Sequence, residues 1–304
     1  MTNMTQLSTP SHDSDWLTLA SAELTAQVNP LGAQLSALKD GAGRDLLWDG
    51  NPAIWAGRAP LLFPIVGALH GGSYRLGSNR YSLSRHGFAR GSRFAVIDTG
   101  PARATFRLTA DDASRRLYPF EFELDVGFVL EAATLSIEST IRNRGDVSMP
   151  ASLGYHPAFR WPLPFGQNRS AHYIEFESDE PAPARRLNGE GLLAPEPIPT
   201  PIVNRRLALA DELFRNDAIV FDDIRSRRVT YGADQGARIG VSFPDSPYLG
   251  VWTKPGANFM CIEPWNGIAD PHGFSDDFAL KPGVFQVAPS ASRSIKIAIS
   301  LLGG

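Results

Sequence analysis

The feature that most constrains the fold is a run between positions 118 and 130 in which every second residue is apolar. The apolar positions are Phe120, Phe122, Leu124, Val126, Phe128 and Leu130, and mostly acidic residues stand between them. A period of two puts every second side chain on the same face of an extended strand. The segment therefore predicts a β-strand with one buried face.

The same period recurs at 104–108, 135–141 and 295–301, and turn signals such as Asn-Arg-Gly at 143–145 separate these runs. The best helix candidate is one short turn over 211–216, with Asp211 at its N-cap. A doubly wound α/β fold would need helical crossovers of about a dozen residues between strands. We therefore predict an all-β, antiparallel fold, a large sandwich of two curved sheets with few short helices.

Composition excludes several classes of protein. The chain has 304 residues, a formal net charge of −3 and 43% hydrophobic residues, which is too apolar for a disordered chain. A pI near 6.1 argues against nucleic acid as a partner. No apolar run is long enough to cross a membrane. The single cysteine, Cys261, excludes an intrachain disulfide and a zinc site built from cysteines.

The N-terminus is polar and lacks the basic start and apolar run of a signal peptide. We expect a flexible leader over 1–15, a single β-sandwich domain over 16–304, and a cytoplasmic protein. The Pro-rich stretch 181–201 is interpreted as a long surface loop within that domain.

Two segments in the first third of the chain carry candidate site residues. Arg58 stands just before an apolar run, and a buried guanidinium needs a partner. That partner is either a core carboxylate or a ligand hydroxyl or phosphate. His86 is followed by Gly87, which allows close backbone approach or an unusual turn. His86 is either a packed, hydrogen-bonded residue or part of a site.

Two later segments carry the stronger candidates. His156 is held by Pro157 and flanked by aromatic residues, which indicates either a site or an aromatic corner of the core. Glu263 ends an apolar strand, shares a face with Phe259 and Cys261, and is followed by proline. If that face lines a cleft, burial raises the pKa of Glu263 and makes it a base near neutral pH. The alternative is a structural salt bridge with Arg58.

Other chemistries lack their motifs. The sequence has no His-Glu-x-x-His metal pattern, no Gly-x-Ser-x-Gly elbow and no phosphate-binding loop. We therefore expect neither a metal nor a cofactor. Cys261 is interpreted as a small buried hydrophobe rather than a nucleophile.

The four segments together resemble the aldose 1-epimerase (galactose mutarotase) family, in particular its bacterial branch often associated with lactose-utilisation operons. The motifs that carry the resemblance, in chain order, are Gly32-Ala-Gln-Leu35, the Arg58 segment, His86-Gly-Phe-Ala-Arg90, Gly154-Tyr-His156-Pro-Ala-Phe, Leu213-Phe-Arg-Asn-Asp217, Leu249-Gly-Val-Trp-Thr-Lys-Pro-Gly256 and Cys261-Ile-Glu263-Pro-Trp. The resemblance runs from about Trp16 to about Leu301 and implies a large antiparallel β-supersandwich.

The resemblance also implies roles for single residues. Glu263 matches the general base that takes the proton from the anomeric hydroxyl, and His156 matches the general acid that protonates the ring oxygen. His86 and Arg58 match substrate-binding positions, and Asp217 matches an aspartate that binds sugar hydroxyls. The partner is then a small-molecule sugar, and the protein is a monomer or a homodimer.

Three functions remain open at this stage. The first is an aldose 1-epimerase acting on a free sugar, which depends on His156 and Glu263. The second is a hexose-6-phosphate mutarotase, because Arg58 and Arg90 together would suit a phosphate. The third is a non-catalytic sugar-binding or sensor protein on the same fold.

Overall fold

The structure is a computed structural model that describes residues 15–303. The expected leader over 1–15 lies outside the described residues except for Asp15, whose carboxylate pairs with Arg93 at 2.9 Å. No helix within the described residues is long and apolar enough to span a membrane.

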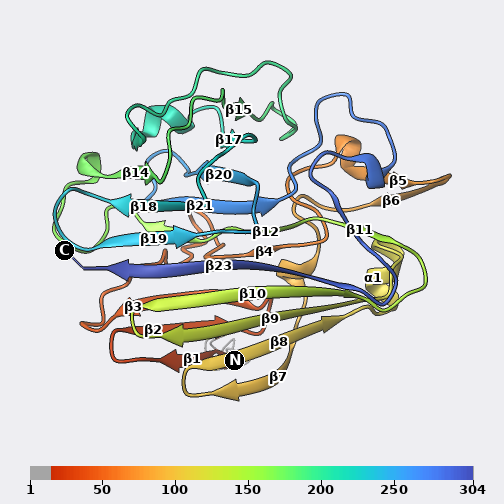
Figure 1. Cartoon of the computed structure of the whole chain (residues 1–304), viewed down its shortest axis with the longest axis horizontal. Coiled ribbons are helices and arrows are strands. Elements are labelled where there is room, and N and C mark those ends of the chain that lie inside the picture. Colours follow the sequence, from red (N-terminus) through yellow and green to blue (C-terminus); the bar gives the residue numbers. More distant parts are fainter. Residues whose placement is uncertain (1–14, 304) are drawn as a thin grey trace, which may run out of the picture.

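The longest sheet has nine strands, and every neighbouring pair in it is antiparallel (Figure 1). In spatial order the strands are β16 (Arg206–Ala208), β14 (Tyr173–Phe176), β18 (Arg228–Gly232), β19 (Arg238–Ser242), β23 (Ser292–Leu302), β10 (Thr134–Asn143), β9 (Phe122–Glu131), β8 (Arg103–Thr109) and β7 (Ala95–Gly100). The four segments with a period of two correspond to β8, β9, β10 and β23.

The second large sheet has seven strands and carries the site. Its strands are β15 (Arg185–Arg186), β17 (Ile219–Phe221), β20 (Tyr248–Trp252), β21 (Phe259–Asn266), β12 (Leu153–Tyr155) and β4 (Leu61–Leu62), with β13 (Ala158–Arg160) also pairing with β21. The smaller sheets are β1 (Leu17–Ala20) with β2 (Leu24–Asn29) and β3 (Gln34–Asp40), β11 (Met149–Ala151) with β22 (Phe285–Val287), and β5 (Ser73–Leu76) with β6 (Asn79–Ser82).

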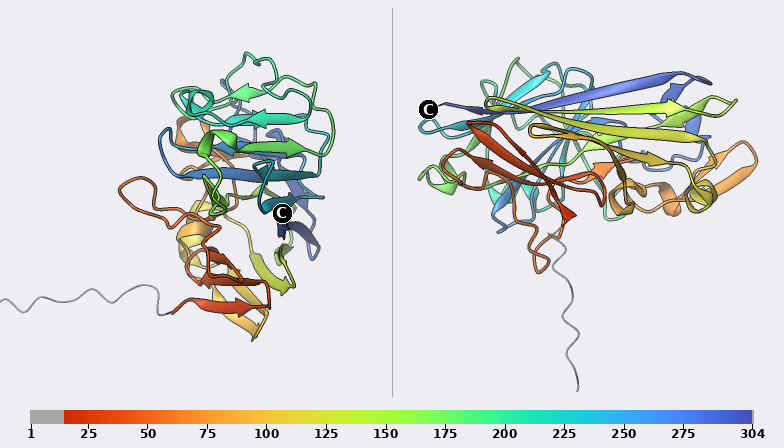
Figure 2. Two further views of the ribbon diagram at one scale, coloured as in Figure 1. Left: turned by 90° about the vertical axis from the view of Figure 1, so that its left-hand side faces the viewer. Right: turned by 90° about the horizontal axis from the view of Figure 1, so that it is seen from below.

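The apolar faces of these sheets pack against one another in a large core. All six apolar positions of the 118–130 alternation are buried there, together with inward-facing residues of β3, β10, β12, β21 and β23. The red N-terminal strands lie beside the β7–β10 part of the long sheet (Figure 2). The all-β, antiparallel class predicted from the alternation is confirmed.

The polar face of β9 differs from a simple solvent face. Glu123 and Asp125 are buried because arginines on neighbouring segments cover them. Asp125 accepts from Arg107 at 2.6 and 2.7 Å and from Arg142 at 2.6 Å. Burial is the largest single effect and raises the pKa of the Asp125 carboxyl, but the hydrogen bonds and charges of Arg107 and Arg142 together outweigh it and hold that pKa below its ordinary value.

Helical structure is short, as expected, and the expected turn is present with a different N-cap, but the α-helix was not predicted. The α-helix is α1 (Asp112–Leu117), capped by Asp111, whose carboxylate accepts from the Ser114 backbone N–H at 2.7 Å. The turn expected over 211–216 is the 3₁₀ helix η5 (Asp211–Phe214), and its N-cap is Ala210 rather than Asp211. The Asp211 carboxylate instead accepts from Arg169 and from the Gly256 N–H. Further 3₁₀ turns between residues 16 and 303 are η2 (His70–Gly72), η3 (Ala89–Gly91), η4 (Arg169–Ala171) and η6 (Phe278–Leu280).

One backbone contact fixes the segment that carries His86. The Phe63 carbonyl, just after β4, accepts from the N–H groups of Phe88 and Ala89 at 3.1 and 3.2 Å. Gly87 has φ +73° and lies so close to that carbonyl that a Cβ would overlap its oxygen. The close backbone approach expected at His86-Gly87 is therefore present.

We predict that Gly87→Ala loses more stability than Gly43→Ala. Both changes put alanine in a left-handed backbone conformation, but only the Cβ at position 87 would also overlap a neighbouring atom. Gly43 has φ +78° but nothing within 4 Å of an added Cβ, so it is a matched control. Left-handed backbone alone costs about 1–2 kcal/mol, and the overlap at Gly87 adds about 1–3 kcal/mol. Urea unfolding of both variants measures the difference. Equal losses of stability would contradict this account of the turn.

Candidate active site

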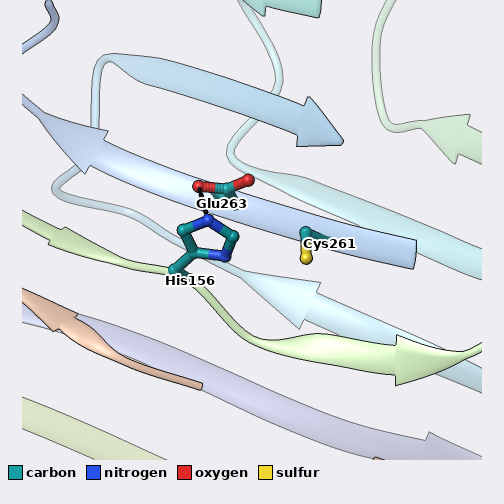
Figure 3. Close-up of side chains that lie close together, drawn as sticks. All are labelled: His156, Cys261 and Glu263. Carbon is teal, nitrogen blue, oxygen red and sulfur yellow. Dashed lines mark ion pairs between the residues drawn. The ribbon is translucent and has the colours of Figure 1, made fainter. Parts of the chain in front are cut away.

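Strand register brings His156 and Glu263 face to face. β12 before His156 and β13 after it both pair with β21, and the two registers agree in setting position 156 opposite 263. Pro157 has no N–H to donate, so the pairing is interrupted there. Nε2 of His156 lies 3.2 Å from Oε2 of Glu263 (Figure 3).

The residue before His156 ties this strand to the opposite sheet. The buried Tyr155 hydroxyl is hydrogen-bonded, at 2.8 Å each, to the Ser139 hydroxyl on β10 and to the Ile295 carbonyl on β23. A buried phenol that is fully paired holds its strand in place. The imidazole of His156 is therefore carried on a fixed piece of backbone.

Both members of the facing pair are removed from water. His156 is 8% exposed and Glu263 is 2% exposed. Burial lowers the pKa of His156 to about 3. Burial, followed by the negative charge of Asp217, raises the pKa of Glu263 well above 4.5, against a smaller opposing interaction with the Trp265 indole. The uncharged form of each group is favoured for the same reason, desolvation.

The hydrogen bonds of His86 fix which of its two ring nitrogens carries the hydrogen. The Gly67 N–H donates to Nδ1 of His86 at 3.1 Å, and the His86 N–H donates back to the Gly67 carbonyl at 2.9 Å. Burial lowers the pKa of His86 well below 6.5, so its ring is neutral at neutral pH. Because Nδ1 accepts, Nε2 carries the ring hydrogen and is free to donate.

These residues line a cavity of about 340 Å³. That size suits a small molecule with a few polar groups. Besides His86, His156 and Glu263, the wall contains Trp55, Arg85, Arg90, Leu187, Asp217, Ala218, Trp252 and Trp265. Indole rings on several sides supply flat apolar surface, and the polar groups lie between them.

Trp55 contacts the facing pair directly. Its ring stacks on the His156 imidazole with centroids 5.1 Å apart and an interplanar angle of 27°. Trp252 meets the same imidazole edge-on at 5.9 Å. The loop that carries Trp55 is held by the Trp48 indole N–H, which donates to the Trp55 carbonyl at 2.9 Å.

Two of the residues around the cavity have unusual backbone conformations. His86 and Asp217 have φ of 69° and 64°, in the left-handed region. Such conformations cost free energy and cluster at functional sites. Asp217 lies 4.0 Å from Arg85, and its backbone carbonyl accepts from Arg186 at 3.2 Å.

The structure brings together five of the six predicted site residues. His86, Arg90, His156, Asp217 and Glu263 all line the cavity. Arg58 does not line it.

Arg58 is held elsewhere by two groups. Its Nη1 donates to the Ser36 carbonyl at 2.8 Å, and its guanidinium lies 5.0 Å from the centre of the Trp16 ring. Neither the Arg58–Glu263 salt bridge, considered above as the structural alternative, nor a clamp formed by Arg58 and Arg90 is present. Backbone carbonyl and indole, rather than a carboxylate or a ligand, satisfy this guanidinium.

Sequence reasoning missed Trp55, Arg85, Trp252 and Trp265. Three of them lie inside or beside motifs that were singled out, since Arg85 precedes His86 and the two tryptophans belong to the 249–256 and 261–265 motifs. Trp55 has no such signal, because its loop reaches the cavity only through the tertiary fold.

Comparison with known proteins identifies the family of the chain. The family model described as Aldose 1-epimerase matches residues 15–283. The chain belongs to the aldose 1-epimerase family.

Similar proteins extend over almost the full length of the chain. Protein LacX, chromosomal, of Lactococcus lactis subsp. lactis is 32% identical over 288 residues, covering 91% of this chain and 96% of that protein. The galactose mutarotase related enzyme from Lactobacillus acidophilus has a TM-score of 0.87 at 29% identity, covering 94% and 97% of the two chains. A galactose mutarotase-like protein from Lactobacillus casei ATCC 334 also has a TM-score of 0.87, at 26% identity, covering 94% and 99%. The family and branch inferred from the motifs are thus confirmed.

We predict that Trp55→Ala raises the pKa of His156 from about 3 toward 6.5, because removing the stacked indole lets water reach the imidazole. Titration of the histidine ring signals by NMR measures the change. The signals of His172, a buried histidine that is not in contact with Trp55, serve as the internal control. An unchanged His156 titration would show that Trp55 does not shield this ring.

Proposed function

We propose that this member of the aldose 1-epimerase family interconverts the α and β anomers of an aldose by opening and closing the sugar ring. The observation that carries the proposal is the His156–Glu263 pair, 3.2 Å apart and buried at the wall of a sugar-sized cavity. Anomer exchange is an isomerisation that moves two protons and needs no net oxidation. A single facing acid and base are sufficient for it.

In ring opening one group of the pair accepts a proton and the other donates one. Glu263 removes the proton of the anomeric hydroxyl, and the O1–H electron pair becomes the second bond of the C1=O1 carbonyl. The C1–O5 bond breaks, and its electron pair takes a proton from His156 at O5. The open aldehyde then rotates about C1–C2.

Ring closure reverses both transfers. His156 takes back the proton from O5, which attacks the other face of C1, and Glu263 returns its proton to O1. The pair therefore holds one proton throughout, on His156 with the closed ring and on Glu263 with the open chain. Burial favours the uncharged state of both groups, and that is the state paired with the open-chain aldehyde.

Neighbouring residues support the same interpretation. The Nε2–H of neutral His86 is available to donate to a sugar oxygen, and the Asp217 carboxylate is available to accept from a sugar hydroxyl. Trp55 and Trp252 offer flat surfaces for the C–H side of a sugar ring. We propose these as binding groups.

Glu263→Gln is predicted to lower kcat for anomer exchange by about 10²–10⁴-fold, because one positioned proton transfer is lost. Polarimetry on a panel of aldoses, corrected for the spontaneous rate, measures the loss. Glu180→Gln is the matched control, since Glu180 is also buried but lies outside the cavity and accepts from the backbone N–H groups of Arg225 and Ser226. Full activity in Glu263→Gln would contradict the mechanism, and sugar binding without acceleration would favour a sugar-binding protein.

The pKa shifts predict a wide pH plateau. An unshifted pair, with values of 4.5 and 6.5, would hold one proton only between those values. Here the second proton binds only near the His156 value of about 3, and the last proton is lost at the raised pKa of Glu263. We expect kcat/KM, measured with a chelator that removes trace metal ions, to stay level as pH falls through 4.5 and to decline only near pH 3 and on the alkaline side. A pH profile in which kcat/KM falls at 4.5 on the acid side and at 6.5 on the alkaline side would contradict these pKa shifts.

A second candidate substrate is a sugar phosphate. Arg85 and Arg90 both line the cavity, and Nη2 of Arg90 donates to the Arg85 carbonyl at 2.8 Å. Desolvation and the neighbouring charge of Arg85 lower the pKa of Arg90. A phosphate group between these guanidiniums would relieve their repulsion.

The two substrate classes respond differently to Arg90→Ala. If the substrate is phosphorylated, this change lowers kcat/KM for glucose 6-phosphate by at least tenfold and leaves the value for glucose nearly unchanged. Coupled measurement of both sugars with the same protein gives the ratio. A preference for glucose in the unaltered protein that survives Arg90→Ala would exclude the phosphate.

A further inference from the structure

The sulfur of Cys261 lies directly beside the facing pair. Cys261 precedes Glu263 by two residues on β21, so both side chains project from the same face of the strand. Figure 3 shows the three side chains gathered across β21 and the neighbouring strand. One ligand atom from each of His156, Cys261 and Glu263 lies within 4.8 Å of the other two.

These distances suit a metal ion. A cation between three atoms that are at most 4.8 Å apart lies within about 2.8 Å of each, and zinc bonds to N, S and O are about 2.0–2.3 Å long. Shifts of well under 1 Å in the side chains would complete the bonds. Catalytic zinc sites use three protein ligands of these types and leave the fourth position open. Here that position faces the cavity, because His156 and Glu263 line it.

Two of the three groups also have buried atoms without hydrogen-bond partners. Oε2 of Glu263 and Nδ1 of His156 are buried and unpartnered, and the 3.2 Å contact between the two side chains lacks hydrogen-bond geometry. Buried polar atoms are nearly always paired. Two of the three side chains therefore have a buried atom with a lone pair that no hydrogen bond occupies, and such atoms can serve as metal ligands.

We propose that His156, Cys261 and Glu263 bind a divalent cation of the zinc class, and that the bound ion closes the sugar site. The thiol releases its proton to the solvent when the metal–sulfur bond forms. The ion occupies the two side chains that the anomer exchange requires, so metal and sugar exclude each other. Binding of the metal is independent of the proposed function, and only the blocking of catalysis rests on it.

The spacing of the three residues explains why no metal motif is visible in the sequence. Cys261 and Glu263 come from one strand, whereas His156 comes from the interrupted strand opposite. The register of the sheet, and not a short pattern, brings the three together.

The direct test is the absorption spectrum of the purified, metal-free protein titrated with Co²⁺. A thiolate bound to Co²⁺ gives a strong ligand-to-metal band, and Cys261 is the single cysteine of the chain, so the band has one possible source. We expect a saturable band at one equivalent that Zn²⁺ abolishes, and no band in Cys261→Ser or Cys261→Ala. Thermal melts confirm that both variants fold. Absence of the band in the unaltered protein would overturn the proposal.

The second arm measures anomer exchange in the presence of Zn²⁺. Cys261 does not line the cavity, so both variants should keep the basal rate. We expect Zn²⁺ to inhibit the unaltered protein in competition with sugar, a chelator to restore the rate, and the variants to need at least tenfold more Zn²⁺. Equal sensitivity of the variants would overturn the role of Cys261. The Co²⁺ titration is carried out without sugar. It therefore tests the metal site even if the protein does not catalyse anomer exchange.

Discussion

The pairing of β21 with the interrupted strand opposite it is the constraint on which the rest of the site depends. Pro157 removes one N–H from that pairing, yet the registers before and after it agree, so His156 and Glu263 meet across the gap. The odd-numbered positions of β21 from 259 to 265 face away from the main core, whereas Met260 and Ile262 point into it. One strand therefore packs into the core through its even-numbered positions and carries Glu263 on the opposite face.

Burial gives this pair its chemistry. An isolated carboxylate and imidazole in water would titrate near 4.5 and 6.5, but desolvation moves the two values in opposite directions past each other. The pair then holds one proton over a wide pH range, and in the proposed mechanism this is the proton that ring opening and closing pass back and forth. The stacked indole of Trp55 and the tightly tied Tyr155 maintain that dry, fixed geometry.

Much of the fold was predictable because strand alternation is a local signal, and every apolar position of the alternation on β9 is buried, although Glu123 and Asp125 between them are buried as well. The helix α1 and the N-cap of η5 were not predictable, since the Asp111–Ser114 capping contacts and the partners of Asp211 depend on a few side chains. At the site, motif order indicated His156 and Glu263, but not that Arg58 would turn to the Ser36 carbonyl while Arg85 faces the cavity. The direction of a long side chain depends on backbone and neighbours that are distant in sequence.

The most direct test of the account follows the anomeric oxygen during exchange. An aldose labelled with ¹³C and ¹⁸O at position 1 is mixed with the protein, and ¹³C NMR reports both the anomer and its oxygen isotope. If the C1–O5 bond opens between Glu263 and His156, the anomers interconvert faster than in the blank while both retain ¹⁸O. Loss of the label at the rate of anomer exchange, or no acceleration with any aldose, would contradict it.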